Sequence, residues 1–305
     1  MTFLRTIPAV LALLATLAVA SGNAPELKIE GARTEVYKTA SDTILRLHLF
    51  EPEGHDPGKD RRPAIVFFFG GGWNSGSPVQ FEQHARYLAS RGMIAAVADY
   101  RVKSRQKTSP RECVADGKSA IRYLRFHAKR LGIDPDRLAA GGGSAGGHVA
   151  AATGMCDGLE DLTEAGSTVS TKPNALVLFN PVYDNGPEGY GHSRIKEWFP
   201  AISPAHNISR DDPPAVVFLG TKDNLIPVAT AEKFQASMKK VGIKYELHLY
   251  EGQPHGFFNE ARGGFEVFAD TLRKMDAFLV DLGYLTGTAD ENAIRALSGK
   301  GGLRK

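Results

Sequence analysis

The stretch GGGSAGGH at residues 141–148 carries the strongest structural signal in this chain. Within it, Gly142-Gly143-Ser144-Ala145-Gly146 matches the G-x-S-x-G pattern of a tight strand-to-helix turn that exposes a serine oxygen. The turn needs small residues, because a side chain at Gly142 or Gly146 would collide with the neighbouring strand or helix. Glycine-rich segments also form plain turns and helix caps, so the match alone leaves both interpretations open. Ser144 is a candidate nucleophile that the rest of the chain must support.

Short apolar runs recur on both sides of this stretch, as buried parallel strands require. They predict strands at 63–69, 93–98, 137–140, 174–179, 215–219 and 245–250. Between them, apolar residues recur at spacings of three and four and predict helices over 114–131, 227–241 and 265–279. The segment 27–50 alternates only partly and predicts an antiparallel hairpin at the sheet edge. The alternation of strands and helices predicts an α/β fold, with a mostly parallel central sheet and helices on both faces.

The ends of the chain differ from its middle. Residues 1–20 hold Arg5, an apolar run and a small-residue Ala-Val-Ala ending, which together fit a cleavable signal peptide. The apolar run is shorter than the roughly 20 residues of a bilayer span, so export to the periplasm or medium is favoured over a membrane anchor. Residues 21–284 predict one α/β domain without a large separate cap. Residues 285–305 predict a polar, frayed tail with one short helix near 289–297.

Composition narrows the classes of partner. The chain has 305 residues, 42% hydrophobic and 23% charged, which is ordinary for a globular protein with a sizeable core. A formal net charge of +3, without a dense basic cluster, makes nucleic acid a poor expectation. The two cysteines, Cys113 and Cys156, are predicted to lie near opposite ends of two parallel helices. They would then be about 13 Å apart along the axis, which predicts two unpaired thiols.

Three residues that can form a proton relay follow predicted strands in the order serine, aspartate, histidine. Ser144 follows 137–140, Asp223 follows 215–219 and His255 follows 245–250. Because the carboxyl ends of parallel strands gather at one crevice, we expect these side chains to meet there. A serine hydroxyl is nearly inert at neutral pH, so His255 would take its proton and Asp223 would fix the imidazole tautomer. The sequence therefore predicts a catalytic triad of Ser144, Asp223 and His255.

Other polar residues compete for these roles. Asp184 follows the preceding strand, at 174–179, and is the second candidate for the acid. His148 lies one helical turn after Ser144 and is expected to point into packing. No histidine pair has the H-E-x-x-H spacing of a zinc site, so neither a metal nor another cofactor is implied.

A second glycine run predicts the site that would hold a negatively charged oxygen. Gly70-Gly71-Gly72-Trp73 directly follows the strand at 63–69 and precedes a helix near Val79. Successive glycines let backbone N–H groups approach an oxyanion without steric cost. We assign donors to Gly71, Gly72 and Ala145, the last being the residue after the nucleophile. The alternative is a plain tight turn.

The motifs in this order resemble the secreted esterases and lipases of the α/β-hydrolase superfamily, near the hormone-sensitive-lipase-like and acetyl-esterase groups. Their pattern is HGGG, then GxSAGG, then Asp, then His, and the likeness covers about 63–279. The resemblance implies an α/β-hydrolase fold and a serine carboxylic-ester hydrolase. In one departure, Phe69 replaces the histidine before the glycine run. That histidine braces the loop through hydrogen bonds, whereas a phenyl ring can brace it only by packing.

Substrate choice should come from loops above Ser144, chiefly 181–214. Aromatic residues there and nearby either form a pocket wall or only pack the connection down, and the wall candidates are Trp73, Tyr100, Tyr183 and Trp198. The absence of a long lid insertion favours small or accessible acyl groups over long-chain fat. Export and the resemblance together favour acetyl or feruloyl esters of carbohydrates. The alternatives are a prolyl-oligopeptidase-like peptidase, whose propeller domain has no room here, and a non-catalytic binding protein on a hydrolase scaffold.

Overall fold

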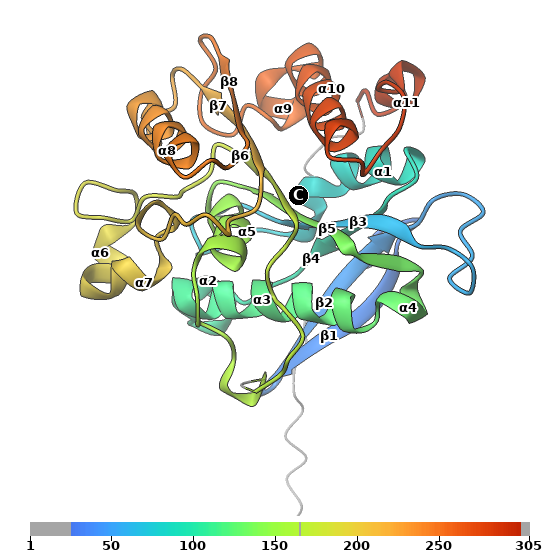
Figure 1. Cartoon of the computed structure of the whole chain (residues 1–305), viewed down its shortest axis with the longest axis horizontal. Coiled ribbons are helices and arrows are strands. Elements are labelled where there is room, and N and C mark those ends of the chain that lie inside the picture. Colours follow the sequence, from blue (N-terminus) through green and yellow to red (C-terminus); the bar gives the residue numbers. More distant parts are fainter. Residues whose placement is uncertain (1–25, 165, 300–305) are drawn as a thin grey trace, which may run out of the picture.

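A single mixed sheet organises the part of the chain that the computed structural model describes, residues 26–164 and 166–299; the predicted signal peptide lies outside it. Its strand order is β1-β2-β4-β3-β5-β6-β7-β8 (Figure 1). β1 and β2 form an antiparallel hairpin at one edge, as expected, and β2 also runs antiparallel to β4. The remaining neighbours are parallel. The strands are β1 (Arg33–Ala40), β2 (Thr43–Phe50), β3 (Arg62–Phe68), β4 (Ile94–Ala98), β5 (Ile133–Gly143), β6 (Ala175–Phe179), β7 (Ala215–Gly220) and β8 (Tyr245–Tyr250).

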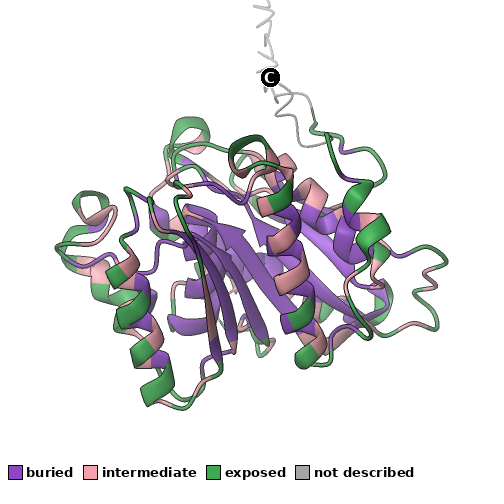
Figure 2. Ribbon diagram, turned by 90° about the horizontal axis from the view of Figure 1, so that it is seen from above, coloured by how far each residue is buried: buried purple, intermediate pink, exposed green. Residues whose placement is uncertain are grey.

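Helices cover both faces of this sheet, which confirms the predicted α/β-hydrolase fold. Successive strand residues point to opposite faces. In β3, Val66 and Phe68 belong to the apolar cluster that also holds residues of α3, α5 and α8, whereas Ile65 and Phe67 belong to the cluster that holds residues of α1 and α10. Figure 2 shows the buried strands between helices whose outer sides are exposed. The α-helices are α1 (Glu82–Ser90), α2 (Lys103–Gln106), α3 (Pro110–Phe126), α4 (Ala128–Leu131), α5 (Ala145–Met155), α6 (His192–Ile195), α7 (Phe199–Ile202), α8 (Val228–Lys240), α9 (Glu260–Gly263), α10 (Phe265–Asp281) and α11 (Glu291–Arg295).

β5 extends well beyond its predicted bounds of 137–140. It runs from Ile133 to Gly143: Gly141 and Gly142 pair with both β3 and β6, and Gly143 pairs with β6. A Cβ on Gly141 would lie 2.6 Å from the ring of Phe67, and one on Gly143 would lie 2.3 Å from the ring of Phe258. Glycine here is a strand residue that lets large aromatic rings press on the backbone, and not only the start of a turn. The longer strand carries the sequence directly to Ser144.

The C-terminal segment also differs from its prediction. The short helix near 289–297 is present as α11, but the described residues 285–299 are not a frayed tail. Leu285, Ile294 and Leu297 are buried with the α10 side of the sheet. In addition, Gln83 Nε2 donates a hydrogen bond of 3.0 Å to the carbonyl oxygen of Leu297. The prediction of a frayed tail followed the glycine and polar content of the segment and gave too little weight to its apolar residues, which recur every four positions at 285, 289, 293 and 297.

Both cysteines are free and buried, which confirms that they do not pair. Burial raises the pKa of the Cys156 thiol to about 12 and raises that of Cys113 well above its ordinary value. Because the thiolate is the reactive form, both groups are unreactive structural thiols at neutral pH.

The single helix predicted over 114–131 is divided into α3 and α4 at His127.

A buried histidine on α1 lies among aromatic rings. The His84 side chain is about 1% exposed, and within the described residues neither ring nitrogen has a hydrogen-bond partner. Its nearest rings are those of Phe81, Phe179 and Phe268, with centroids 5.0, 5.0 and 5.2 Å away. Burial lowers the pKa of His84 to about 3, because the imidazolium would lose its hydration there.

His84 should therefore make the fold less stable in acid. Between its folded pKa of about 3 and the ordinary histidine value of about 6.5, the unfolded chain binds more protons, so stability falls as pH falls through this window. The free energy of unfolding should fall between pH 7 and pH 5, and in His84→Leu this fall should be about 2 kcal/mol smaller than in the wild type. Urea unfolding at the two pH values measures this difference. His206→Leu is the control at a partly exposed ring, and an equal change in both variants would contradict the prediction.

Candidate active site

The turn between β5 and α5 has the strained geometry expected of an exposed nucleophile. Ser144 has φ 54° and ψ −120°, a conformation that a non-glycine residue rarely adopts. The flanking glycines are required sterically: a Cβ on Gly142 would lie 2.4 Å from the carbonyl oxygen of Gly146, and one on Gly146 would lie 2.1 Å from that of Phe68. The Ser144 N–H donates to the Phe179 carbonyl oxygen at 2.9 Å, which fixes the turn against β6.

The structure brings the three predicted triad side chains together. His255 Nδ1 lies 2.7 Å from Asp223 Oδ2, and His255 Nε2 lies 2.9 Å from Ser144 Oγ. Since a carboxylate only accepts, the first contact places the imidazole proton on Nδ1 and leaves Nε2 to accept from the hydroxyl. Asp223 Oδ1 is occupied by the N–H groups of Leu225 and Ile226, at 2.8 and 2.9 Å. The Asp223 side chain is fully buried, so its other oxygen is held toward the imidazole.

The second candidate for the acid lies apart from this relay. Asp184 Oδ1 accepts from the N–H of Gly186 at 2.8 Å, and it lies 4.0 Å from Nδ1 of His206. The carboxylate beside His255 is that of Asp223, because the turn after β7 is hydrogen-bonded to the turn after β8: the Lys222 N–H donates to the Gln253 carbonyl oxygen at 3.0 Å. The geometry therefore favours Asp223 over Asp184 in the acid position.

The glycine loop after β3 offers unpaired backbone donors beside the serine. A Cβ on Gly70 would lie 3.3 Å from Ser144 Cβ, so the loop and the nucleophile are adjacent. Within the described residues, no hydrogen bond uses the N–H groups of Gly71 or Gly72. The Gly71 carbonyl accepts from Asn74 and Ser75, which fixes the peptide plane that carries the Gly72 N–H. Gly71 and Gly72 have φ of 128° and 62°, values that favour glycine.

Phe69 braces this loop by packing, as the departure from the family pattern implied. Its ring stacks on that of Tyr100, with centroids 4.1 Å apart. Tyr100 also donates its hydroxyl to the Phe69 carbonyl oxygen at 2.6 Å, while Gln80 Oε1 accepts from the Gly70 N–H at 2.6 Å. A tyrosine and a glutamine therefore supply the hydrogen bonds on either side of the missing histidine. Sequence reasoning missed Gln80, which no motif marks.

The predicted aromatic wall does not form as a unit. Tyr100 is fully buried beneath the glycine loop, so the expectation that it lines a substrate pocket is wrong. Trp198 packs against a small apolar cluster around Val114 and Ile202, which favours the packing role over the pocket role. Tyr183 stacks on Phe234, with centroids 4.3 Å apart. It also lines a cavity of about 20 Å³, whose other walls include Tyr190, Leu225 and Ile226.

Trp73 connects the glycine loop to the segment 181–214. It is 2% exposed, and its Nε1–H donates to His148 Nδ1 at 3.2 Å. His148 then donates from Nε2 to the Ile202 carbonyl oxygen at 3.0 Å, and burial lowers its pKa to about 4, so the ring is neutral. The expectation that His148 points into packing is confirmed. Arg194 adds a second link, a hydrogen bond of 2.6 Å from Nη1 to the Gly72 carbonyl oxygen.

Asn180, which sequence reasoning did not select, also reaches the relay. It directly follows β6 and is fully buried. Its Nδ2 lies 3.4 Å from His255 Nε2, and its Oδ1 accepts from the Gly256 N–H at 3.0 Å. The available signal was its position, because a polar residue at the carboxyl end of a buried strand faces the same crevice as the triad.

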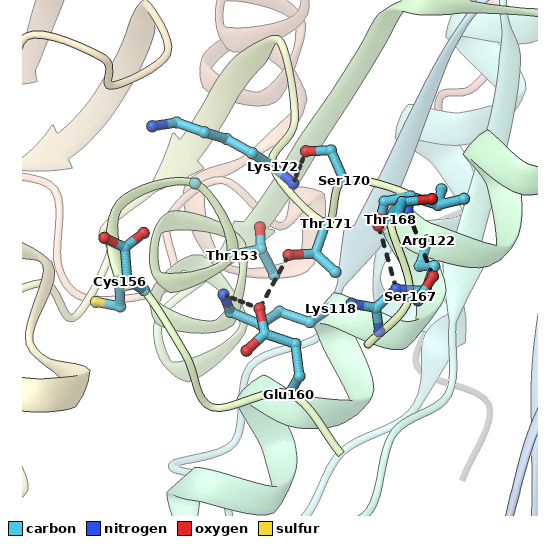
Figure 3. A pocket seen from close by; sticks show the side chains of 13 residues that line it. Lys118, Arg122, Thr153, Cys156, Glu160, Ser167, Thr168, Ser170, Thr171 and Lys172 are labelled. Atoms are coloured by element: carbon cyan, nitrogen blue, oxygen red, sulfur yellow. Dashed lines mark hydrogen bonds and ion pairs between the residues drawn. The ribbon is translucent and has the colours of Figure 1, made fainter. Parts of the chain in front are cut away.

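A cavity near the C-terminal end of α5 lies away from this relay. It measures about 290 Å³, and the residues that line it are drawn in Figure 3. By helix rise, this end of α5 lies roughly 15 Å from Ser144. Lys118 and Arg122 line it, and each pairs with a carboxylate: Lys118 with Glu160 at 3.1 Å, and Arg122 with Glu164. These compensated charges favour a structural role. The reactive arrangement is at the other end of the helix.

None of the helices within residues 26–164 and 166–299 combines the length and the apolar character needed to cross a bilayer.

Comparison with known proteins shows that this chain is similar to several esterases. The BD-FAE family model matches residues 47–186. Among curated proteins, the chain is similar to a probable isoprenylcysteine alpha-carbonyl methylesterase, ICMEL1, of Arabidopsis thaliana, with 28% identity over 74% of this chain and 52% of that protein. It is also similar to an acetylxylan esterase of Xylanibacter ruminicola, with 27% identity over 72% of this chain and 44% of that one. The chain thus spans about half the length of the curated relatives it matches.

A solved structure covers nearly the whole described fold. The apo form of Thermogutta terrifontis esterase 2 superimposes with a TM-score of 0.82 and 46% identity, over 86% of this chain and 98% of that one. The same esterase has been solved phosphorylated by paraoxon and with butyrate bound.

Proposed function

Because this chain belongs to the esterases of the α/β-hydrolase superfamily, we propose that it hydrolyses carboxylic esters through Ser144, His255 and Asp223. The observation that carries the proposal is the relay of 2.9 Å and 2.7 Å from hydroxyl to imidazole to carboxylate. Each member lies on a turn just beyond a parallel strand. The relay is therefore assembled by the sheet itself and does not depend on a separate domain.

Acylation begins when Ser144 Oγ attacks the ester carbonyl carbon while its proton passes to His255 Nε2. The resulting imidazolium keeps its Nδ1–H on the Asp223 carboxylate, which stabilises the positive charge. The tetrahedral carbon then expels the alcohol, which takes the proton from Nε2. The products of this half-reaction are the free alcohol and an acyl ester on Ser144.

The negative charge on the tetrahedral oxygen is assigned to the N–H groups of Gly71, Gly72 and Ala145. Their fixed backbone positions stabilise the charge without reorganisation during the reaction. Water then attacks the acyl-enzyme with His255 as the base, and the carboxylic acid is released as Ser144 recovers its proton. No cofactor enters these steps.

We infer short acyl groups as the substrate class, with acetyl or feruloyl esters of carbohydrates as the favoured natural substrates. One solved relative binds butyrate, and one curated relative is an acetylxylan esterase. The apolar residues at 7–20 further support export, with cleavage near Ser21.

The test compares hydrolysis of aryl esters of increasing acyl length with acetylated xylan, a feruloylated oligosaccharide and a peptide amide. We expect kcat/KM to be largest for acyl chains of two to four carbons and at least one glycan ester to be hydrolysed. An organophosphonate probe should label the protein, and peptide mapping should place the adduct on Ser144. A preference for the peptide amide would favour the peptidase alternative, and no labelling together with no turnover would favour a binding protein.

A further inference from the structure

Asn180 occupies the point where β6 meets the relay. Its side chain is fully buried, and its backbone has φ 35°, an uncommon value for a non-glycine residue. The backbone N–H donates to the Phe218 carbonyl oxygen at 2.7 Å, which ties the residue to β7. Because the backbone is strained and the side chain is fully buried, the carboxamide is held in one orientation, toward the loop that carries His255.

The orientation of the Asn180 carboxamide follows from its backbone partner. Gly256 offers an N–H at 3.0 Å, and an N–H can only donate, so the group facing it must be Oδ1. The NH₂ group therefore faces His255 Nε2, at 3.4 Å. A flipped carboxamide would place two donors against each other at Gly256. Asn180 thus presents a donor, and not an acceptor, to the nitrogen that exchanges the proton with Ser144.

We propose that Asn180 is a positioning residue that keeps His255 Nε2 available to Ser144 and to the leaving alcohol. This inference rests on the proposed function. Because the Asn180 NH₂ group cannot accept a proton, a protonated Nε2 finds its acceptors only at Ser144 Oγ and the leaving oxygen. Through Gly256, the carboxamide oxygen also fixes the loop from which the imidazole projects.

The charges around the imidazole show how the role of Asn180 can be tested, because only one of the two ring nitrogens faces a carboxylate. Asp223 faces Nδ1 at 2.7 Å, and Arg262 Nη1 donates to the His255 carbonyl oxygen at 3.1 Å. Ser144 and Asn180, the groups facing Nε2, are both neutral. An aspartate at position 180 would place a second carboxylate against the imidazole, where it would accept the Nε2 proton and hold it away from Ser144.

The test measures kcat/KM for a neutral aryl ester from pH 5 to 9 in four proteins: wild type, Asn180→Asp, Asn180→Ala and Asn224→Asp. Asn180→Asp should move the acid limb of the profile upward by at least one pH unit and lower kcat at pH 6 more than tenfold. Asn224→Asp adds the same charge at an exposed position beside Asp223, and its limb should stay within a few tenths of a unit. Circular dichroism checks that each variant folds.

Asn180→Ala keeps the proposal testable if the aspartate variant fails to fold. It should lower kcat about tenfold with little change in KM, because the loop is released while the binding surfaces are unchanged. A limb shift in Asn180→Asp no larger than in Asn224→Asp, or an unchanged kcat in Asn180→Ala, would overturn the inference. An inactive wild type would instead contradict the proposed function, so the two failures are distinguishable.

Discussion

Ser144→Ala is expected to lower kcat by about 10⁶, the loss seen when the nucleophile of a serine hydrolase is removed. The alanine removes only the attacking oxygen, while the glycine loop and the imidazole stay in place. Residual turnover should therefore remain above the uncatalysed rate. Steady-state kinetics on an aryl acetate measures the change, with active-site titration to exclude contaminating wild-type enzyme.

The matched control for this variant is Ser75→Ala, which changes the same group on the nearby glycine loop. Ser75 contributes its backbone N–H to the Gly71 carbonyl, and alanine retains that N–H. Its activity should stay within a few-fold of wild type. A loss at Ser144→Ala of less than a hundredfold would show that another group carries the attack.

Asp223→Asn is expected to lower kcat by about 10⁴, by analogy with serine proteases. An asparagine Nδ2 facing His255 Nδ1 would favour the tautomer with the proton on Nε2, and the base could then no longer accept from Ser144. The hydrogen bonds from Leu225 and Ile226 to Oδ1 can be kept by the asparagine oxygen, so the fold should survive. The measurement is kcat on the same ester.

Asp184→Asn tests the alternative acid in the same assay. Its oxygen can still accept from Gly186, so we expect a change of less than tenfold. A loss at Asp184→Asn equal to that at Asp223→Asn would move the acid to the turn after β6.

The sequence predicted those features of the structure for which a local pattern of residues is compatible with only one arrangement. The alternation of buried strands and amphipathic helices predicts the layered sheet, and residues that follow strands predict the convergence of Ser144, Asp223 and His255. It failed where a residue's role depends on packing between distant segments. Tyr100 was expected to line the pocket, but it is buried against Phe69, thirty-one positions away in the chain, and no local pattern reveals that contact. Asn180 carried no motif, and its role is visible only once Gly256 lies against it.

The chain of hydrogen bonds from Trp73 through His148 to Ile202 has a consequence for protein engineering. Gly191 packs so closely on Trp73 that a Cβ there would lie 2.6 Å from the indole. Exchanging 181–214 for the corresponding loop of a relative would therefore also alter the shape of the glycine loop at 70–72, to which we assign the oxyanion. Chimeras that retain Gly191 and hold the backbone carbonyl of residue 202 beside His148 should keep turnover while their substrate preference changes. Chimeras that replace Gly191 or displace this carbonyl should lose rate on every ester, whichever loop they carry.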